Sequence, residues 1–296
     1  MAIKTVKATI NGSTYDLTYN ASQDAWTATL TAPGSTSFNL PGGYYDVTVT
    51  ATNDAGTQST ASAATNDGCK LTVKETVKPV ITILSPTSGA YTTNNKQPIT
   101  FTVTDEAGGS GVDISSLAVK IDGTALAASA IKATAITNGY SVTATPSAAL
   151  SDGSHAATIN CSDNDGNAAV EKTTSYTIDT VPPTLNVTSP AEGLITATQT
   201  VTVSGTTNDA TSSPTIVTVN GNSVTVAANG TFSTTVTLAE GDNTITIIAT
   251  DAAGKSTTVV RHVTLDTSVP EIKSVTITPN PANTGASMII KVVIEE

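Results

Sequence analysis

The sequence predicts an all-β protein built from tandem repeats. Of its 296 residues only 4% are aromatic, and no stretch carries the apolar stripe expected of an amphipathic helix. A motif of Leu, a nearby turn Gly, an alternating strand and a final turn Gly occurs three times. Each copy has the same length, and the copies run from Leu40 to Gly56, from Leu150 to Gly166 and from Leu238 to Gly254. Alternation that ends at an Asp, Asn and Gly turn is typical of a half-buried strand entering a hairpin.

A second hairpin is predicted upstream of each copy. Its signal is Asn-Gly or Asp-Gly between two alternating runs, because both central residues of a type I′ turn need positive φ. The three turns are at Asn11, Asp122 and Asn220. One aromatic residue follows in each unit, at Trp26, Tyr140 and Phe232. We interpret these rings as core residues, since an aromatic ring buries more area than its aliphatic neighbours.

A proline-rich block opens two of the units. It starts at Pro79 and at Pro183, and it leads into two further strands. Proline is confined to the edges and first residues of strands, so these blocks mark domain junctions. The predicted domains are residues 1–76, 77–179 and 180–267, followed by a strand pair at 268–296. The first domain lacks its first two strands, and the strand pair is that missing block with nothing after it.

The chain resembles tandem bacterial immunoglobulin-like domains. The resemblance rests on the segment from Asp179 to Pro183, on a tyrosine corner ending at Tyr45 and on the turn from Ala249 to Gly254. It implies three tandem immunoglobulin-like β-sandwiches plus a C-terminal strand pair. The chain departs from antibody domains because it has no Cys pair within a domain. Its opening and closing segments also resemble, more loosely, Ig-like structural proteins of bacteriophage tails.

The mismatched ends lead to an assembly hypothesis. A sandwich that lacks two strands exposes apolar core and unpaired edge groups, both of which accept strands from another chain. We expect the strand pair of one molecule to complete the first domain of the next, giving a head-to-tail filament. The apolar residues expected to do so are Ile272, Val275, Ile277, Met288, Ile290, Val292 and Ile294. Two alternatives stay open: a small five-stranded first domain with a capping hairpin, and strand exchange with a different virion protein.

We expect no cofactor, and calcium is the one candidate that the residue pattern raises. Asp163, Asp165 and Asn167 place oxygen-bearing side chains at alternate positions, which suits a hard cation. Asp105, Glu106 and Asp113 lie in a Gly-rich loop of the same unit. The run lacks the bidentate Glu of an EF-hand loop. Asp and Asn also form such turns unaided by bonding their own backbone. An intramolecular Lys-Asn or Lys-Asp isopeptide bond is a further alternative, which intact mass would reveal as a loss of ammonia or water.

Composition argues against several function classes. A net charge of -11 with thirteen basic residues disfavours nucleic acid and anionic membranes as partners. The only histidines, His155 and His262, fall in different domains, so neither a catalytic triad nor a multi-histidine zinc site is expected within one unit. We therefore expect no enzyme activity. Cys69 and Cys161 lie in different repeats and are interpreted as reduced, small core side chains.

The preferred interpretation is a non-enzymatic structural protein of a phage tail or tail-like particle. No signal peptide or membrane span is recognised, so the protein is expected to be made in the cytoplasm and to reach a virion or the extracellular space on release. Its expected partners are other copies of itself or other virion proteins, together with host cell-surface glycans. The alternative is a secreted bacterial adhesin or glycan-binding module, with Tyr44 or Tyr91 stacking on sugars.

Overall fold

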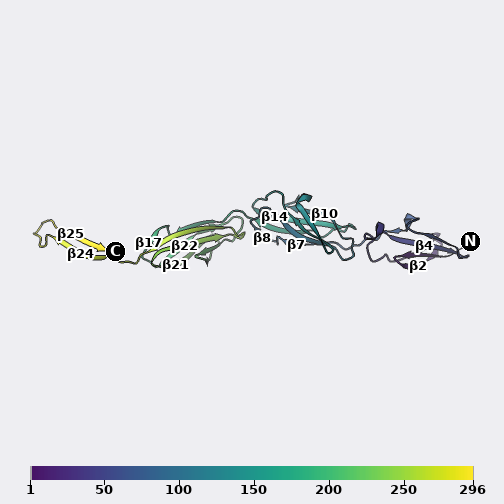
Figure 1. Ribbon diagram of the computed structural model, residues 1–296, viewed down its shortest axis with the longest axis horizontal. Coiled ribbons are helices and arrows are strands. Elements are labelled where there is room, and N and C mark those ends of the chain that lie inside the picture. Colours follow the sequence, from purple (N-terminus) through teal and green to yellow (C-terminus); the bar gives the residue numbers. More distant parts are fainter. Residues whose placement is uncertain (1, 296) are drawn as a thin grey trace. The chain divides into compact units, whose positions relative to one another are not determined.

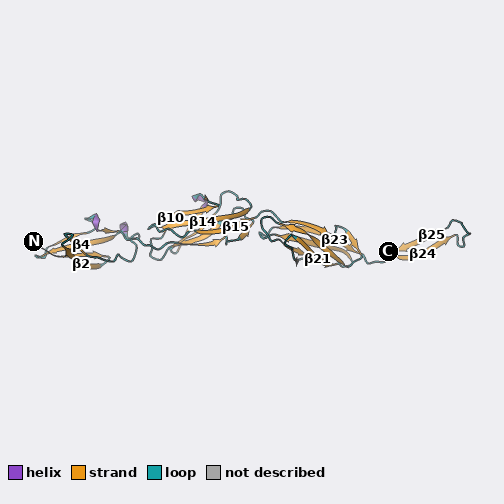
Figure 2. Cartoon of the chain, turned by 180° about the vertical axis from the view of Figure 1, so that it is seen from behind, coloured by secondary structure: helices purple, strands orange, loops and turns teal. Residues whose placement is uncertain are grey.

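The computed structural model describes residues 2–295, and strands form almost all of its regular structure (Figures 1 and 2). The helical pieces in that range are three single 3-10 turns at Pro41–Gly43, Asp67–Cys69 and Ala128–Ala130. None of the helices in the described part of the chain is long and apolar enough to span a bilayer. The all-β fold class, with tandem immunoglobulin-like domains and a separate C-terminal strand pair, is confirmed.

The first domain is a single connected sheet. Its order is β3-β2-β1-β4-β5, with β6 paired to β4. The predicted hairpin joins β1 to β2. Its turn has the positive φ angles that type I′ requires, 46° at Asn11 and 78° at Gly12. The strands are β1 (Ile3–Ile10), β2 (Ser13–Asn20), β3 (Ala25–Thr27), β4 (Tyr45–Asn53), β5 (Gln58–Ala61) and β6 (Lys70–Leu71).

The second domain has two sheets, ordered β12-β13-β9-β7 and β11-β10-β14-β15-β8. Ile99, Phe101 and Val103 of β9 are all 0% exposed and lie in its core. The strands are β7 (Val80–Ser85), β8 (Ala90–Thr92), β9 (Ile99–Thr104), β10 (Val112–Ile121), β11 (Thr124–Ala125), β12 (Ile131–Ile136), β13 (Gly139–Ala144), β14 (Gly153–Asp163) and β15 (Lys172–Ile178).

The third domain repeats this plan with sheets β16-β18-β21 and β17-β23-β22-β19-β20. Val203, Ile245 and Ile247 are 0% exposed at its centre. Its strands are β16 (Thr184–Ser189), β17 (Leu194–Thr196), β18 (Thr200–Asn208), β19 (Ile216–Val219), β20 (Asn222–Val224), β21 (Thr231–Thr237), β22 (Gly241–Thr250) and β23 (Ser256–Leu265). The chain then forms a two-stranded hairpin of β24 (Glu271–Thr278) and β25 (Ile289–Glu295).

The first domain buries its core less than the other two. Val47, Val49 and Ala51 of β4 are only half-buried, whereas Ile159 of β14 and Ile247 of β22, which occupy the same repeat position as Val49, are 0% exposed. The cause is the missing layer, because the described first domain has no counterpart of the β7–β9 or β16–β18 pair. One face of its sheet therefore lacks a packing partner of that kind.

The three repeated aromatic residues do not share one environment. Phe232 is 3% exposed in the core of the third domain, as predicted. Trp26 and Tyr140 are only half-buried, so their interpretation as full core residues is wrong. The Trp26 ring packs instead against Tyr19, with centroids 5.9 Å apart. The tyrosine corner is present: Tyr45 is 7% exposed and its hydroxyl donates to the Ser35 carbonyl at 3.1 Å.

Candidate metal centres

The second and third domains each contain a cluster of three carboxylates. Each cluster takes one acid from the segment just before the opening proline block, Glu75 or Asp179, and one from the residue that follows β9 or β18, Asp105 or Asp209. The matching strand registers make these positions equivalent, since Val80 pairs with Thr104 and Thr184 pairs with Asn208. Two of the three acids in each cluster therefore occupy equivalent positions, whereas the third is Glu106 in one cluster and Asp251 in the other.

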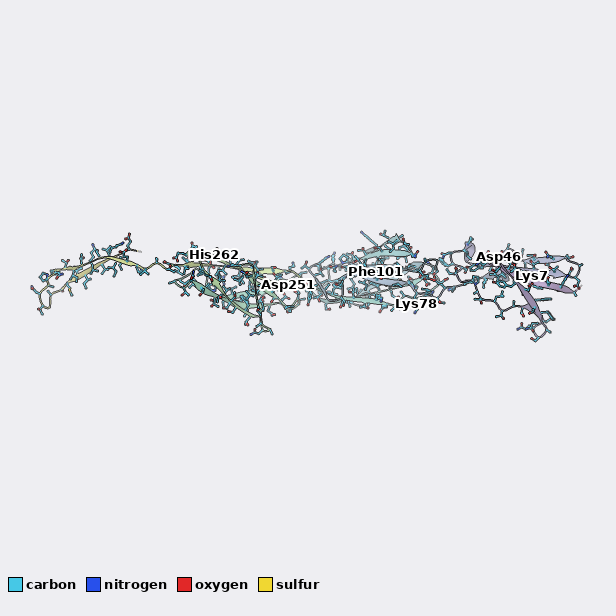
Figure 3. All side chains as sticks on the ribbon, turned by 90° about the horizontal axis from the view of Figure 1, so that it is seen from below. Lys7, Asp46, Lys78, Phe101, Asp251 and His262 are labelled. Atoms are coloured by element: carbon cyan, nitrogen blue, oxygen red, sulfur yellow. The ribbon has the colours of Figure 1, made fainter. Side chains whose placement is uncertain are left out.

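The cluster of the third domain consists of Asp179, Asp209 and Asp251, whose ligand atoms all lie within 4.8 Å of one another. All three residues are buried, and Asp179 is 0% exposed. The position of Asp251, in a turn after β22, is marked in Figure 3. Because the ends of β18 and β22 and the linker before β16 meet at one place, three acids distant in sequence are brought together.

Most oxygens of this cluster bond locally. Asp179 Oδ1 accepts the Val181 N–H at 3.0 Å and its Oδ2 accepts the Ser212 hydroxyl. Asp209 Oδ1 accepts the N–H groups of Thr211 and Ser212, each at 2.8 Å. Asp251 Oδ1 accepts the Lys255 N–H at 2.8 Å, while Oδ2 is buried and has no hydrogen-bond partner among the described residues.

The charge of this cluster is not balanced by protein groups. None of the ion pairs in the described chain involves its three carboxylates. Two like unit charges at the 4.8 Å limit of the cluster repel by on the order of 3 kcal/mol at an effective dielectric constant near 20. A bound cation would offset this repulsion.

The cluster of the second domain consists of Glu75, Asp105 and Glu106. Glu75 Oε1 accepts the Ser110 N–H, and Asp105 Oδ2 accepts the Gly111 N–H at 2.7 Å. One oxygen of each of the three carboxylates is buried without a described partner. Burial raises the pKa of Asp105, the Gly111 N–H lowers it, and the nearby negative charge of Glu75 raises it further, so that the net pKa lies above its usual value.

Gly109 shapes this second-domain cluster. A Cβ at this position would lie 2.7 Å from Glu106 Cδ and 2.9 Å from Glu75 Oε2. Any other residue would therefore push into the space that the carboxylates surround. The backbone of Gly109 is additionally held in place by its carbonyl, which accepts the Asn39 side-chain N–H at 2.6 Å.

The three residues predicted to bind calcium, Asp163, Asp165 and Asn167, do not belong to either carboxylate cluster. Asp163 and Asn167 come together, with Asp163 accepting the Asn167 N–H and side-chain N–H, each at 2.8 Å. Asp165 faces the first domain, where its Oδ2 accepts the Thr36 hydroxyl at 2.5 Å and the Glu75 N–H at 3.0 Å. This loop thus closes a turn and contacts the first domain through protein hydrogen bonds.

Sequence reasoning missed the acids of the third-domain cluster. Asp179, Asp209 and Asp251 are far apart in the chain, whereas a search for ligand spacing favours a compact run. A usable signal was present, because an acid precedes the opening proline block at Glu75, Asp179 and Asp266 alike. An acid that recurs at one phase of a repeat points to a shared structural role.

Two hydrogen bonds hold the His155 ring in place. His155 Nδ1 lies 2.7 Å from Asp122 Oδ2, and its Nε2 lies 2.8 Å from the Ser151 carbonyl. Asn243, at the same repeat position, donates to the Ala239 carbonyl at 2.7 Å. Both side chains therefore bond a carbonyl four residues earlier and hold the corner before a strand.

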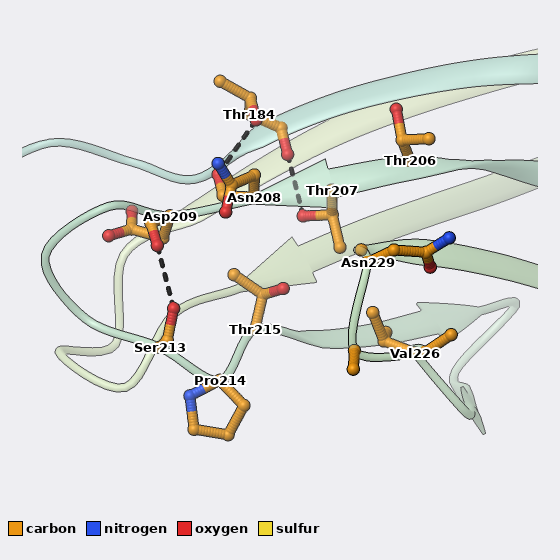
Figure 4. Close-up of a pocket in the computed structure, with 13 residues that line it drawn as sticks. Thr184, Thr206, Thr207, Asn208, Asp209, Ser213, Pro214, Thr215, Val226 and Asn229 are labelled. Carbon is orange, nitrogen blue, oxygen red and sulfur yellow. Dashed lines mark hydrogen bonds between the residues drawn. The ribbon is translucent and has the colours of Figure 1, made fainter.

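A cleft of about 430 Å³ lies beside Asp209 in the third domain (Figure 4). Its lining contains no Lys, Arg, His or Cys. The polar side chains there bond to neighbouring backbone: Thr207 donates to the Thr184 carbonyl and Ser213 to the Asp209 carbonyl, each at 2.8 Å. The cleft therefore offers no pairing of a nucleophile with a base.

The predicted assembly residues lie on or beside the terminal hairpin, and all are exposed. Their exposed fractions range from 41% for Ile277 to 62% for Ile272. Ile272 pairs with Ile294, Val275 with Val292 and Ile277 with Ile290. Directly opposed residues share a face of a sheet, so these six side chains form one apolar surface, here called the donor face. Met288 lies just before β25.

Two family models each match one part of the chain. Residues 80–180 match the family model of the bacterial Ig-like domain, and residues 183–267 match that of glucodextranase, domain B. No curated protein matches the chain. Tandem domains of this kind are consistent with a structural or adhesion-type module, and they are typically non-catalytic.

Among solved structures, similar chains come from several sources. The fibronectin(III)-like modules of CbhA from Clostridium thermocellum are 18% identical, with a TM-score of 0.40 over 63% of this chain and 94% of theirs. The I-band fragment I67–I69 of titin is 14% identical, with a TM-score of 0.43 over 89% and 88%. A tetra-tandem repeat in the extending region of a large adhesion protein is 20% identical, with a TM-score of 0.33 over 98% and 79%.

Proposed function

We propose that this chain is a non-enzymatic structural protein of a phage tail or tail-like particle, and that it assembles head to tail by strand complementation. The observation that carries the proposal is a pair of matching unpartnered faces. One is the donor face of the terminal hairpin, and the other is the half-buried inner face of the first-domain sheet. The virion setting is supported by the looser resemblance of the chain's opening and closing segments to Ig-like tail proteins.

The terminal hairpin has the same strand register as the β7–β9 pair of the second domain. Glu271 pairs with Glu295 directly after Pro270, as Val80 pairs with Thr104 directly after Pro79. Aligning the pairs puts the three inward residues of β25 in the places of Ile99, Phe101 and Val103, which are 0% exposed in the second domain. Ile290, Val292 and Ile294 are therefore aliphatic side chains at positions that a complete domain buries.

The first-domain sheet offers the corresponding acceptor. Val47, Val49 and Ala51 are half-buried, although the residues at these positions in the second domain, Ala157, Ile159 and Cys161, are at most 3% exposed. Covering this face would remove apolar surface from water, at roughly 25 cal/mol for each Å². The occupant that we propose is the terminal hairpin of a second copy of this chain.

Two substitutions on neighbouring residues test the assembly. Val292 lies on the donor face, whereas Val293 pairs with Ser274 and points to the other side of the hairpin. We expect the wild-type chain to grow in mass with concentration in light scattering, Val292→Asp to stay monomeric, and Val293→Asp to assemble as the wild type does. Both variants add the same charge to the same exposed strand. A difference between them therefore shows that the donor face makes the contact between molecules.

A permuted chain provides the complementary control. Moving residues 270–295 ahead of β1 through a short Gly/Ser linker supplies the missing strands within one molecule. This variant should be monomeric, and its first domain should melt at a higher temperature. A wild-type chain that is monomeric at every concentration, or equal behaviour of Val292→Asp and Val293→Asp, would refute assembly through these faces.

The biological setting needs a separate experiment. Mass spectrometry of density-purified particles from the producing cells should detect peptides of this chain in stoichiometric amount. Absence from such particles, together with binding of the purified chain to host cells or to a glycan array, would favour the adhesin alternative instead.

A further inference from the structure

We propose that each of the two carboxylate clusters binds one calcium ion. The third-domain cluster supplies Asp179, Asp209 and Asp251, and the second-domain cluster supplies Glu75, Asp105 and Glu106. This inference is independent of the assembly of the chain, because every ligand in a cluster comes from one molecule. It assigns the ions to places other than the loop of Asp163, Asp165 and Asn167.

Unused buried oxygens are the first reason. Asp251 is 5% exposed and Asp105 is 7% exposed, yet Asp251 Oδ2 and Asp105 Oδ1 have no hydrogen-bond donor among the described residues. In each case the other carboxylate oxygen accepts a backbone N–H. The local turn is thus already closed by one oxygen, and the second is left for a ligand. Buried polar atoms without a partner are uncommon, because their desolvation is not compensated.

The internal repetition is the second reason. The linker acid and the acid after β9 or β18 recur at the same register in both domains, although the surrounding residues differ. A turn-forming role explains one oxygen of an Asp, but it does not require two or three such acids to converge. Gly109 adds a further sign in the second domain, because its missing Cβ leaves room beside Glu75 and Glu106.

The donor set selects the kind of ion. Both clusters offer carboxylate oxygens, and neither includes His or Cys. Oxygen ligands alone suit a hard cation such as Ca²⁺ or Mg²⁺ rather than Zn²⁺. Calcium accepts irregular sets of six to eight oxygens, whereas magnesium demands near-ideal octahedral geometry. Carboxylates held by strand ends and a linker form an irregular set, which fits calcium better than magnesium.

Calorimetric titration of the full chain, stripped of metal, tests the sites directly. We expect two calcium ions per chain. Asp251→Asn replaces only the unpartnered oxygen of its cluster, because the amide oxygen can still accept the Lys255 N–H; it should remove one ion. Asp105→Asn should remove the other, and the double variant should bind none. Matched controls are Asp242→Asn and Asp113→Asn, exchanges in the same domains but outside the clusters, which should keep both ions.

Thermal unfolding supplies a second measurement, because the effect of Asp251→Asn on the Tm should differ between calcium and chelator. In calcium, Asp251→Asn should lower the Tm by several degrees, because a bound ion stabilises only the folded state. In chelator the same substitution should leave the Tm unchanged or raise it, because it removes like-charge repulsion. A variant that merely damaged the fold would lower the Tm in both conditions.

Three results would overturn the proposal. The first is a wild-type chain with no binding heat and the same Tm in millimolar calcium and in chelator. The second is full calcium binding by the double variant. The third is loss of binding in Asp165→Asn with retention in Asp105→Asn, which would assign the ion to the loop from Asp163 to Asn167 instead.

Discussion

The imidazole of His155 lies 2.7 Å from the carboxylate of Asp122, and this contact fixes β14 to the turn between β10 and β11. His155 is 7% exposed. Burial alone would lower its pKa, but the Asp122 carboxylate and the Ser151 carbonyl outweigh burial and place the net pKa above 6.5. For Asp122 the effect of burial has the opposite sign and would raise the pKa. The hydrogen bonds from His155 and from the Ala156 N–H outweigh burial and hold the pKa below 3.8.

The pair therefore predicts a pH window for the second domain. The stability from His155 is complete below pH 6.5 and is lost as pH rises through its higher folded pKa. The stability from Asp122 is complete above pH 3.8 and is lost as pH falls through its lower folded pKa. We expect Asp122→Asn to cost about 1 kcal/mol at pH 5.5, a value reduced for the solvent exposure of Asp122. Its cost should shrink at pH 9 in urea unfolding, and an equal cost at both pH values would contradict this account.

For Tyr176 we predict that removing a polar group does not reduce stability. It is 1% exposed, and its hydroxyl has no hydrogen-bond partner in the described chain. Burial raises its pKa to about 12. Tyr176→Phe should leave stability unchanged or raise it by up to about 1 kcal/mol, because it removes an uncompensated buried polar group. Tyr45→Phe is the matched control and should cost about 1 kcal/mol, since the Tyr45 hydroxyl donates to Ser35.

Gly205 predicts a large packing cost in the third domain. An added Cβ would lie 2.2 Å from the Asn186 carbonyl oxygen and 2.8 Å from Phe232 Cζ. Gly205→Ala should destabilise the domain by about 1–3 kcal/mol or more, because the backbone carbonyl cannot move aside without disturbing the pairing of β16 and β18. Chemical denaturation measures this cost. Gly205→Ala combined with Phe232→Leu should recover only the part that is due to the ring.

The two cysteines should be inert in the folded protein. Both are free and buried, and burial raises the pKa of Cys161 to about 11, with the Asp163 charge adding to the effect. Because the thiolate is the reactive species, native protein should react with a thiol reagent at pH 8 much more slowly than unfolded protein. Fast labelling of Cys161 without denaturant would show that β14 opens readily.

Local turn chemistry made much of the fold predictable. Asn11, Asp122 and Asn220 all adopt positive φ, between 46° and 50°, as the Asn-Gly and Asp-Gly pairs require. Strand alternation and the positions of the hairpins follow from such short-range rules. Burial did not follow so simply, because the exposure of Trp26 depends on whether a second sheet covers it, and composition cannot report that.

The third-domain carboxylate cluster could not be predicted from sequence spacing for a different reason. Asp163 and Asn167 attract attention because they are close in sequence, but they satisfy each other through two hydrogen bonds. Asp179 and Asp251 meet only because a linker and a strand end reach the same edge of a folded domain. Proximity of that kind is a product of topology, and spacing along the chain carries little information about it.

The donor face and the half-buried first-domain sheet belong to different ends of one chain, so every molecule carries one of each. A polymer joined through them would be polar, with an open sheet at one terminus and a free hairpin at the other. The two termini would then respond to different inhibitors. An isolated peptide of residues 268–296 would cap only the open-sheet terminus, whereas a chain truncated before residue 268 would cap only the hairpin terminus.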